Sequence, residues 1–147
     1  MSLDLAPPLS KRRLKAWIRL LGAARAVETS LSRTLRAQGT TLPRFDVMAA
    51  LWRRREGLTM TDLSRLLLVS PGNATAVVDR LEAEGLARRT RGADRRSVTV
   101  ALTPEGLRLF ESLALRHEAE VDRLLAPWDE ADLDAASDLL RRLGAPR

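Results

Sequence analysis

The sequence predicts a mainly α-helical chain with one small β-hairpin, and the spacing of its apolar residues carries that prediction. Apolar residues recur at intervals of three and four through most of the chain, which is the period of an amphipathic helix. The period changes to two only between residues 86 and 102, where a pair of strands is expected. Because 147 residues suit one domain with a real core, we expect a single domain over residues 1–147.

A long amphipathic helix is expected over residues 10–37. Its apolar stripe comprises Leu14, Trp17, Ile18, Leu21, Ala24, Leu31 and Leu35. The other face is rich in lysine and arginine and carries only Glu28 as an acid. Such a face is usually solvated, and contact with a nucleic acid is the alternative.

Two shorter helices are expected next. Pro43 can open the first, because proline is tolerated in the first turn of a helix, where its missing N–H costs nothing. The doublet Glu56-Gly57 ends that helix. Thr59 is a plausible N-cap for the second, and the leucines that follow form its buried side.

A tight turn over residues 68–71 then leads to a helix with one apolar and one polar face. Ser70 can cap this helix, Pro71 takes its first position, and Gly85 ends it as a left-handed C-cap. The apolar face carries Ala74, Val77, Val78 and Leu81. A helix-turn-helix needs such a turn and such an outer face, because its second helix lies in the major groove of DNA.

The hairpin follows this helix directly, with strands expected over residues 86–91 and 97–102 and with Gly92 in the turn. Its basic residues are Arg88, Arg89, Arg91, Arg95 and Arg96, against the one acid Asp94. A tip this basic can enter a minor groove, whose negative potential attracts arginine, or it can lie along phosphates. We therefore expect a winged helix-turn-helix over residues 40–102.

Two more helices are expected within residues 103–144. Thr103-Pro104-Glu105 looks like a capped start, Pro127 breaks the first helix, and the second has an acidic first turn from Asp129. The apolar stripes of these helices and of residues 10–37 are longer than the winged helix can cover. We expect a partner chain to bury the remainder, with packing inside one chain as the alternative.

The segments LTMTDLSRLLLVSPGNATAVVDRLEAEGLARR, residues 58–89, and DRRSVTVALTPEG, residues 94–106, resemble the MarR family of bacterial transcription regulators. The resemblance implies a homodimer built from residues 10–37 and 103–144, and it implies a repressor on a pseudo-palindromic operator. By the family pattern, Asp94 orients Arg96 towards the minor groove and Arg95 lies nearer the backbone. The alternative is an exposed Asp94–Arg96 ion pair that contributes almost nothing.

The residues expected to bind DNA are Ser70, Pro71, Gly72, Asn73, Thr75, Ala76, Arg80, Arg91, Asp94, Arg95 and Arg96. Asn73 can hydrogen-bond adenine, Thr75 can meet a phosphate or a thymine methyl, and Arg80 is expected on a phosphate. Ala76 is shorter than the side chain that relatives often carry there. We therefore expect few direct contacts to base edges, with DNA shape and phosphate contacts contributing more of the affinity.

The resemblance also implies a small aromatic or lipophilic ligand where the dimerisation lobe meets the DNA-binding lobe. The candidate ligand-binding residues are Trp17, Phe45, Trp52 and His117. Each of them also fits a core or interface position on an apolar helical face, which is the more common role of such residues.

Composition excludes several other classes of protein. The chain has no cysteine and one histidine, and it has no glycine-rich phosphate loop. We therefore expect that the protein is not an enzyme and not a thiol-based sensor, and that it binds no metal ion and no cofactor. No apolar run approaches the roughly 20 residues of a membrane span, and the N-terminus does not resemble a secretory signal, so we expect a soluble cytoplasmic protein.

The charge balance favours a polyanionic partner, because the net charge is +6 and the isoelectric point is near 11.2. Double-stranded DNA is the partner that the winged helix-turn-helix predicts. The alternatives are a non-specific architectural DNA-binding protein and a winged helix used for protein–protein contact.

Overall fold

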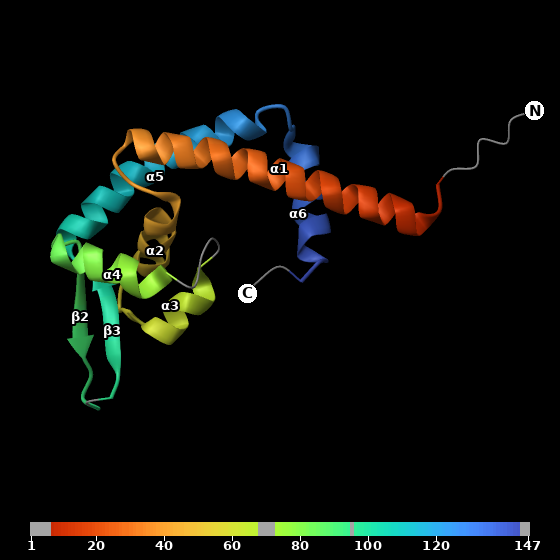
Figure 1. Cartoon of the computed structure of the whole chain (residues 1–147). Coiled ribbons are helices and arrows are strands. Elements are labelled where there is room, and N and C mark those ends of the chain that lie inside the picture. The colour runs from red at the N-terminus through yellow and green to blue at the C-terminus, as the bar shows by residue number, and fades with distance from the viewer. Residues whose placement is uncertain (1–6, 68–72, 95, 145–147) are drawn as a thin grey trace, which may run out of the picture.

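The computed structural model describes residues 7–67, 73–94 and 96–144, and over these residues the chain is mainly helical with a small antiparallel sheet (Figure 1). The elements are α1 (Leu9–Ala37), α2 (Leu42–Arg53), β1 (Leu58–Thr59), α3 (Met60–Leu66), α4 (Ala74–Ala83), β2 (Ala87–Arg91), β3 (Val98–Leu102), α5 (Pro104–Leu125) and α6 (Glu130–Arg141). The predicted fold class is confirmed.

Two helix starts are capped by the threonines that the sequence predicts. The Thr59 hydroxyl accepts the Asp62 N–H at 3.1 Å, and the Thr103 hydroxyl accepts the Gly106 N–H at 3.1 Å. Asp129 caps α6. At the other end of α4, Gly85 has a φ of 73°, the left-handed conformation predicted for it. Apart from the start of α4, whose predicted residues Ser70 and Pro71 lie outside the described residues, the local signals define the helix ends to within about one or two residues.

The sheet contains a short strand that the sequence analysis did not predict. The strand order is β1-β3-β2, so β3 is central and both of its neighbours are antiparallel to it. Leu58 and Arg89 both lie opposite Val100, which is fully buried. Since β1 has only two residues, it shows no alternation that a period of two could reveal.

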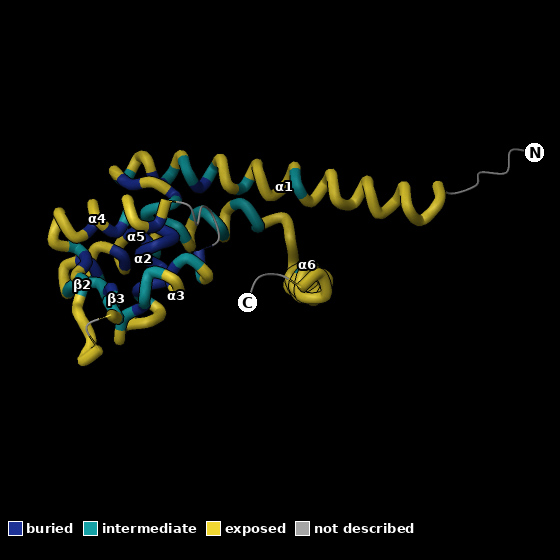
Figure 2. The backbone as a smooth tube through the Cα atoms, turned by 60° about the horizontal axis from the view of Figure 1, so that its bottom comes forward, coloured by how far each residue is buried: buried dark blue, intermediate teal, exposed yellow. Residues whose placement is uncertain are grey.

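The core lies where α2, α3, α4, the base of the hairpin and the first half of α5 meet (Figure 2). Its largest fully buried side chains are Leu35, Met48, Leu51, Leu63, Leu81, Val47, Val78 and Val100. α2 runs through the middle, because most of its residues are buried on both faces. The DNA-binding elements predicted from the sequence therefore share one continuous core.

The first half of α1 and the whole of α6 lie outside this core (Figures 1 and 2). Leu14, Trp17 and Ile18 are 52%, 54% and 60% exposed, although they belong to the predicted apolar stripe. α6 has no buried residue. The apolar stripe of α6 and the first half of that of α1 are thus left uncovered by the described part of the chain.

Within the described ranges, no helix combines the length and the apolar character needed to cross a membrane.

Candidate nucleic-acid interface

α4 presents the two faces that a recognition helix requires. Ala74, Val78 and Leu81 are buried against the core. The predicted DNA-contacting residues Asn73, Thr75, Ala76 and Arg80 are all exposed. The Asn73 side chain makes no capping hydrogen bond, so its amide is not used in starting the helix. Ser70, Pro71 and Gly72 lie outside the described residues.

The turn of the hairpin is held together by backbone hydrogen bonds and by the Asp94 carboxylate. The Gly92 N–H donates to the Ser97 carbonyl at 2.8 Å, and the Ser97 N–H donates to the Asp94 carbonyl at 3.0 Å. One Asp94 carboxylate oxygen, Oδ1, accepts the Arg96 N–H at 3.3 Å. In the described part of the turn, Asp94 therefore holds the backbone of Arg96, and no ion pair joins the two side chains.

Arg91 and Arg96 are both exposed, one at the end of β2 and the other just before β3. The hairpin places them on the two sides of its turn. Arg95, the other arginine predicted at this tip, lies outside the described residues. An exposed guanidinium on a structured turn can reach a phosphate or a narrow groove without losing contacts within its own protein.

Arg89 differs from the other arginines of the hairpin, because it is bound by the protein itself. Its guanidinium contacts Asp79 at 2.6 Å and Glu82 at 2.7 Å, both on α4. The hydrogen bond to Asp79 is the main reason that the pKa of Arg89 is raised above its ordinary value. Arg89 thus ties β2 to α4, and the basic charge available at the hairpin is smaller than the sequence suggests.

The sequence analysis missed this role, although α4 does carry a signal for it. Asp79 and Glu82 are three residues apart on one helix, so their carboxylates project from the same side. A basic residue on the strand that follows the helix can pair with both. The sequence does not reveal which of the neighbouring arginines will point towards α4.

The four candidate ligand-binding residues divide into three places. Phe45 and His117 stack with ring centroids 4.3 Å apart and line a cavity of about 560 Å³ among α1, α2, α5 and the residues leading to α6. Trp52 packs against Phe110, with ring centroids 5.7 Å apart, and does not line the cavity. Trp17 is half exposed in the first half of α1 and is also absent from the cavity wall.

The cavity is mostly apolar, and His117, one of the residues that line it, has a ring nitrogen buried inside the protein. The buried Nδ1 of His117 has no hydrogen-bond partner among the described residues. Burial also lowers the pKa of His117 below its ordinary value, so the ring favours its neutral form. Trp128 lines the same cavity and was not predicted, because it follows the break at Pro127, where helical periodicity gives no guidance.

Among the residues that the structure describes, no group of histidine, aspartate and glutamate side chains could hold a metal ion.

An exposed polar face on α4, a basic two-stranded wing beside it and α3 packed against it together define a winged helix-turn-helix DNA-binding protein. The family model described as "MarR family" matches residues 38–97, which span α2, α3, α4 and most of the wing.

Individual relatives extend the similarity beyond these residues. The chain is 31% identical over 123 residues to YkoM of Bacillus subtilis (strain 168), an uncharacterized HTH-type transcriptional regulator, covering 83% of this chain and 79% of YkoM. The crystal structure of a MarR family transcriptional regulator from Silicibacter pomeroyi matches with a TM-score of 0.79 and 29% identity, covering 94% of this chain and 96% of that one.

A third similar protein is BpsR of Bordetella bronchiseptica, whose structure concerns the regulation of its DNA binding by 6-hydroxynicotinic acid. It matches with a TM-score of 0.77 and 25% identity, covering 88% of this chain and 98% of BpsR. The chain belongs to the MarR family, and it is a DNA-binding transcription regulator.

Proposed function

We propose that this protein is a cytoplasmic homodimeric repressor whose two winged helices bind a pseudo-palindromic operator, and that a small aromatic ligand releases it. The observation that carries the proposal is the pairing of an exposed polar face on α4 with exposed arginines at the wing. The first supplies hydrogen-bonding groups of the kind that read a major groove, and the second supplies charge for a minor groove or for phosphates.

The proposed dimer rests on the uncovered apolar surface of α1 and α6. Leu14, Trp17 and Ile18 on α1, with Leu133 and Leu140 on α6, are large apolar side chains that are more than a third exposed. A second copy of the chain is the economical cover, because a two-fold symmetric dimer buries the same patch on both subunits. Residues 10–37 and 103–144 then form the dimerisation lobe, and residues 40–102 form the DNA-binding lobe.

Within this proposal each exposed residue has one role. Asn73 and Thr75 approach base edges from α4, and Arg80 binds a phosphate. Arg96 enters the minor groove beside Arg91, with Asp94 holding the turn that carries them. Ala76 leaves α4 with a short side chain at its centre, which makes groove shape more important than base contacts.

Ser70, Pro71, Gly72 and Arg95 remain proposed contacts from the sequence alone. The first three precede α4, and the fourth belongs to the wing tip. Their proposed role is to bring the backbone and one more charge close to the phosphates.

The proposed ligand site is the cavity lined by Phe45 and His117. Its apolar wall and the stacked pair suit a flat aromatic molecule. The response of BpsR to 6-hydroxynicotinic acid supports a ligand of this size. Trp17 and Trp52 do not line the cavity, so we do not include them among its contacts.

The test of the DNA site is Arg96→Ala, with fluorescence anisotropy on operator duplexes selected from genomic fragments. We expect a severe loss of operator affinity with the dimer intact by size-exclusion chromatography and light scattering. Arg116→Ala, the same change at an exposed position of α5, is the matched control and should bind as the wild type does.

Two results would contradict parts of the proposal. Unchanged affinity in Arg96→Ala would remove the wing from DNA recognition. Equal affinity for the selected operator and for random duplex would favour the non-specific architectural alternative. A panel of phenolic and heteroaromatic acids in differential scanning fluorimetry tests the ligand, and a complete absence of stabilisation by the panel would count against it.

A further inference from the structure

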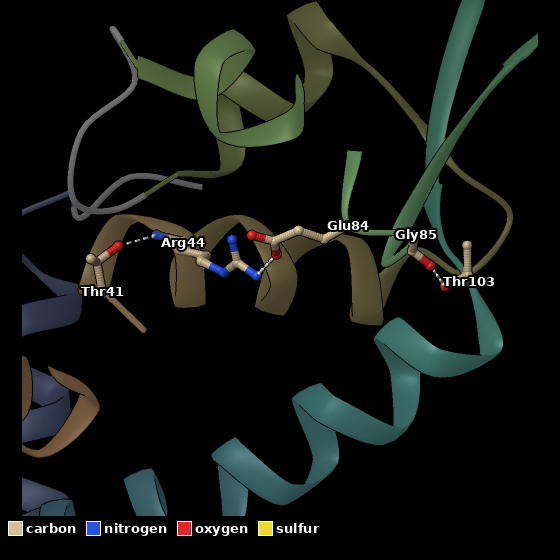
Figure 3. Close-up of polar contacts among 5 residues, drawn as sticks. All are labelled: Thr41, Arg44, Glu84, Gly85 and Thr103. Atoms are coloured by element: carbon tan, nitrogen blue, oxygen red, sulfur yellow. Dashed lines mark hydrogen bonds and ion pairs between the residues drawn. The ribbon is translucent and has the colours of Figure 1, made fainter. Parts of the chain in front are cut away.

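The C-terminal end of α4 is bound directly to the start of α5 (Figure 3). The Thr103 hydroxyl donates to the Gly85 carbonyl at 2.7 Å, and the Thr103 N–H donates to the Leu86 carbonyl at 3.0 Å. Both carbonyls belong to the turn that ends α4. The Thr103 side chain therefore caps α5 and also hydrogen-bonds to the end of α4.

The two segments also touch at the level of the backbone. A Cβ placed on Gly106 would lie 2.0 Å from the Leu86 carbonyl oxygen and 3.0 Å from its carbonyl carbon. Only glycine fits there, because no side-chain carbon tolerates a backbone atom at that distance. The first turn of α5 thus leaves no space between itself and the end of α4.

A second attachment reaches the same end of α4 from α2. The Arg44 side chain is 19% exposed and pairs with Glu84, the residue that follows the last turn of α4 (Figure 3). The hydrogen bond from Arg44 holds the pKa of Glu84 below its ordinary value. The end of α4 is therefore held from two helices.

α5 is shared by the DNA-binding core and by the proposed dimerisation lobe. Its first half contributes Phe110 and Leu113 to the core. Its second half lies along α1, where the Ser30 hydroxyl donates to Glu120 Oε1 at 2.8 Å. A 22-residue helix joins these two regions without a break.

We propose that Thr103 is a positioning residue for DNA recognition: by binding the Gly85 carbonyl it makes α4 turn together with α5, so that the dimerisation lobe sets the distance between the two recognition helices. Arg44 holds the same end of α4 from α2, through its ion pair with Glu84. The part that concerns two recognition helices rests on the proposed homodimer. Half-site spacing on an operator follows directly from that distance.

The experiment measures distances between spin labels, which the absence of native cysteine makes possible with no background labelling. Ala76→Cys on α4 with Arg116→Cys on α5 reports the distance between these points of the two helices inside one protomer, after dilution with unlabelled protein. Ala76→Cys alone reports the distance between the two recognition helices of a dimer. Both positions are exposed.

In this background Thr103→Val removes the hydroxyl and keeps the branched shape. We expect both distance distributions to broaden and shift, and Thr103→Ser to restore them because it keeps the donor. Thr29→Val is the matched control. It also loses one hydrogen bond from a threonine hydroxyl, which donates to the Arg25 carbonyl at 2.9 Å, but that bond lies within α1 and involves neither α4 nor Arg44. It should leave both distributions unchanged.

Operator affinity gives a second readout, measured on unlabelled protein that keeps Ala76 and well below the melting temperature. We expect the operator affinity of Thr103→Val to fall about threefold to tenfold, the effect of one hydrogen bond, and that of Thr29→Val to stay almost unchanged. Either single change, Arg44→Glu or Glu84→Arg, should broaden the intraprotomer distance distribution. The double variant, which exchanges the two charges, should recover the wild-type distribution.

The outcomes separate the two proposals. Unchanged distance distributions in Thr103→Val, or equal broadening in Thr29→Val, would overturn the positioning role. A complete lack of dipolar signal from Ala76→Cys alone would overturn the homodimer, and the intraprotomer pair would still decide the role of Thr103.

Discussion

The close contact between Gly106 and Leu86 leads to a quantitative prediction for Gly106→Ala. The added methyl carbon would lie 2.0 Å from the Leu86 carbonyl oxygen, whereas real contacts of this kind do not fall below 3.0 Å. The start of α5 must therefore move away from the end of α4 by about 1 Å or more, since backbone atoms on both sides cannot rotate aside.

The expected loss of stability has three parts. Forcing an extra methyl group into a packed contact costs about 1–3 kcal/mol, and stretching the hydrogen bond from Thr103 to Leu86 costs about 1 kcal/mol more. Alanine returns up to about 1 kcal/mol, because it is a better helix former than glycine. The net destabilisation is about 2 kcal/mol, which corresponds to a melting temperature lower by roughly 4–8 °C.

Thermal and urea unfolding monitored by circular dichroism test this value. Gly22→Ala is the matched control, because a Cβ at that position of α1 meets no atom within 4 Å. It should be neutral or stabilising by up to about 1 kcal/mol. A Gly106→Ala variant as stable as the wild type would show that the contact can relax freely, and the backbone argument would then be wrong.

Three further predictions concern charge. Arg80→Ala should lower the affinity for the operator and for random DNA alike, and it should flatten the slope of log affinity against log salt concentration by about one unit. A loss of affinity confined to one base position of the operator would instead show that Arg80 contacts a base. The single histidine permits a direct NMR titration: we expect the pKa of His117 below 6.5, so its stabilising effect is lost as the pH falls below that value, because the unfolded chain takes up the proton first. A value above 6.5 would contradict the burial argument. The hydrogen bonds from Arg123 and Ser30 lower the pKa of Glu120 to about 2 from 4.5, so its contribution is present above pH 4.5 and disappears as the pH falls towards 2. Urea unfolding of Glu120→Gln across that range should lack this part of the acid dependence, and identical curves for variant and wild type would exclude it.

Most helix and strand boundaries could be predicted because their causes are local. Thr59, Thr103 and Asp129 each cap the helix that directly follows them, and the alternation after Ser97 marks β3. The outward face of α4 followed from spacing alone, since positions three and four apart share one side of a helix.

The site was predicted less completely, because its chemistry depends on contacts between distant residues. Arg89 belongs to the basic charge that the sequence predicts at the hairpin, but in the structure it is bound to Asp79 and Glu82. Asp94 was expected to orient Arg96 and in the structure holds its backbone N–H. Neither result can be read from composition, since each depends on which way a side chain points once the hairpin is packed.

The sequence by itself determined the order of the helices and of the two hairpin strands, the winged helix-turn-helix at their centre and the polar face that α4 turns to solvent. Those features follow from periodicity and capping, which act over a few residues. Only the tertiary structure decided which arginines remain exposed, that Phe45 and His117 share a cavity, and that Gly106 lies against Leu86. The reason is that such contacts join residues distant in the chain, and their distances depend on how all the helices pack together.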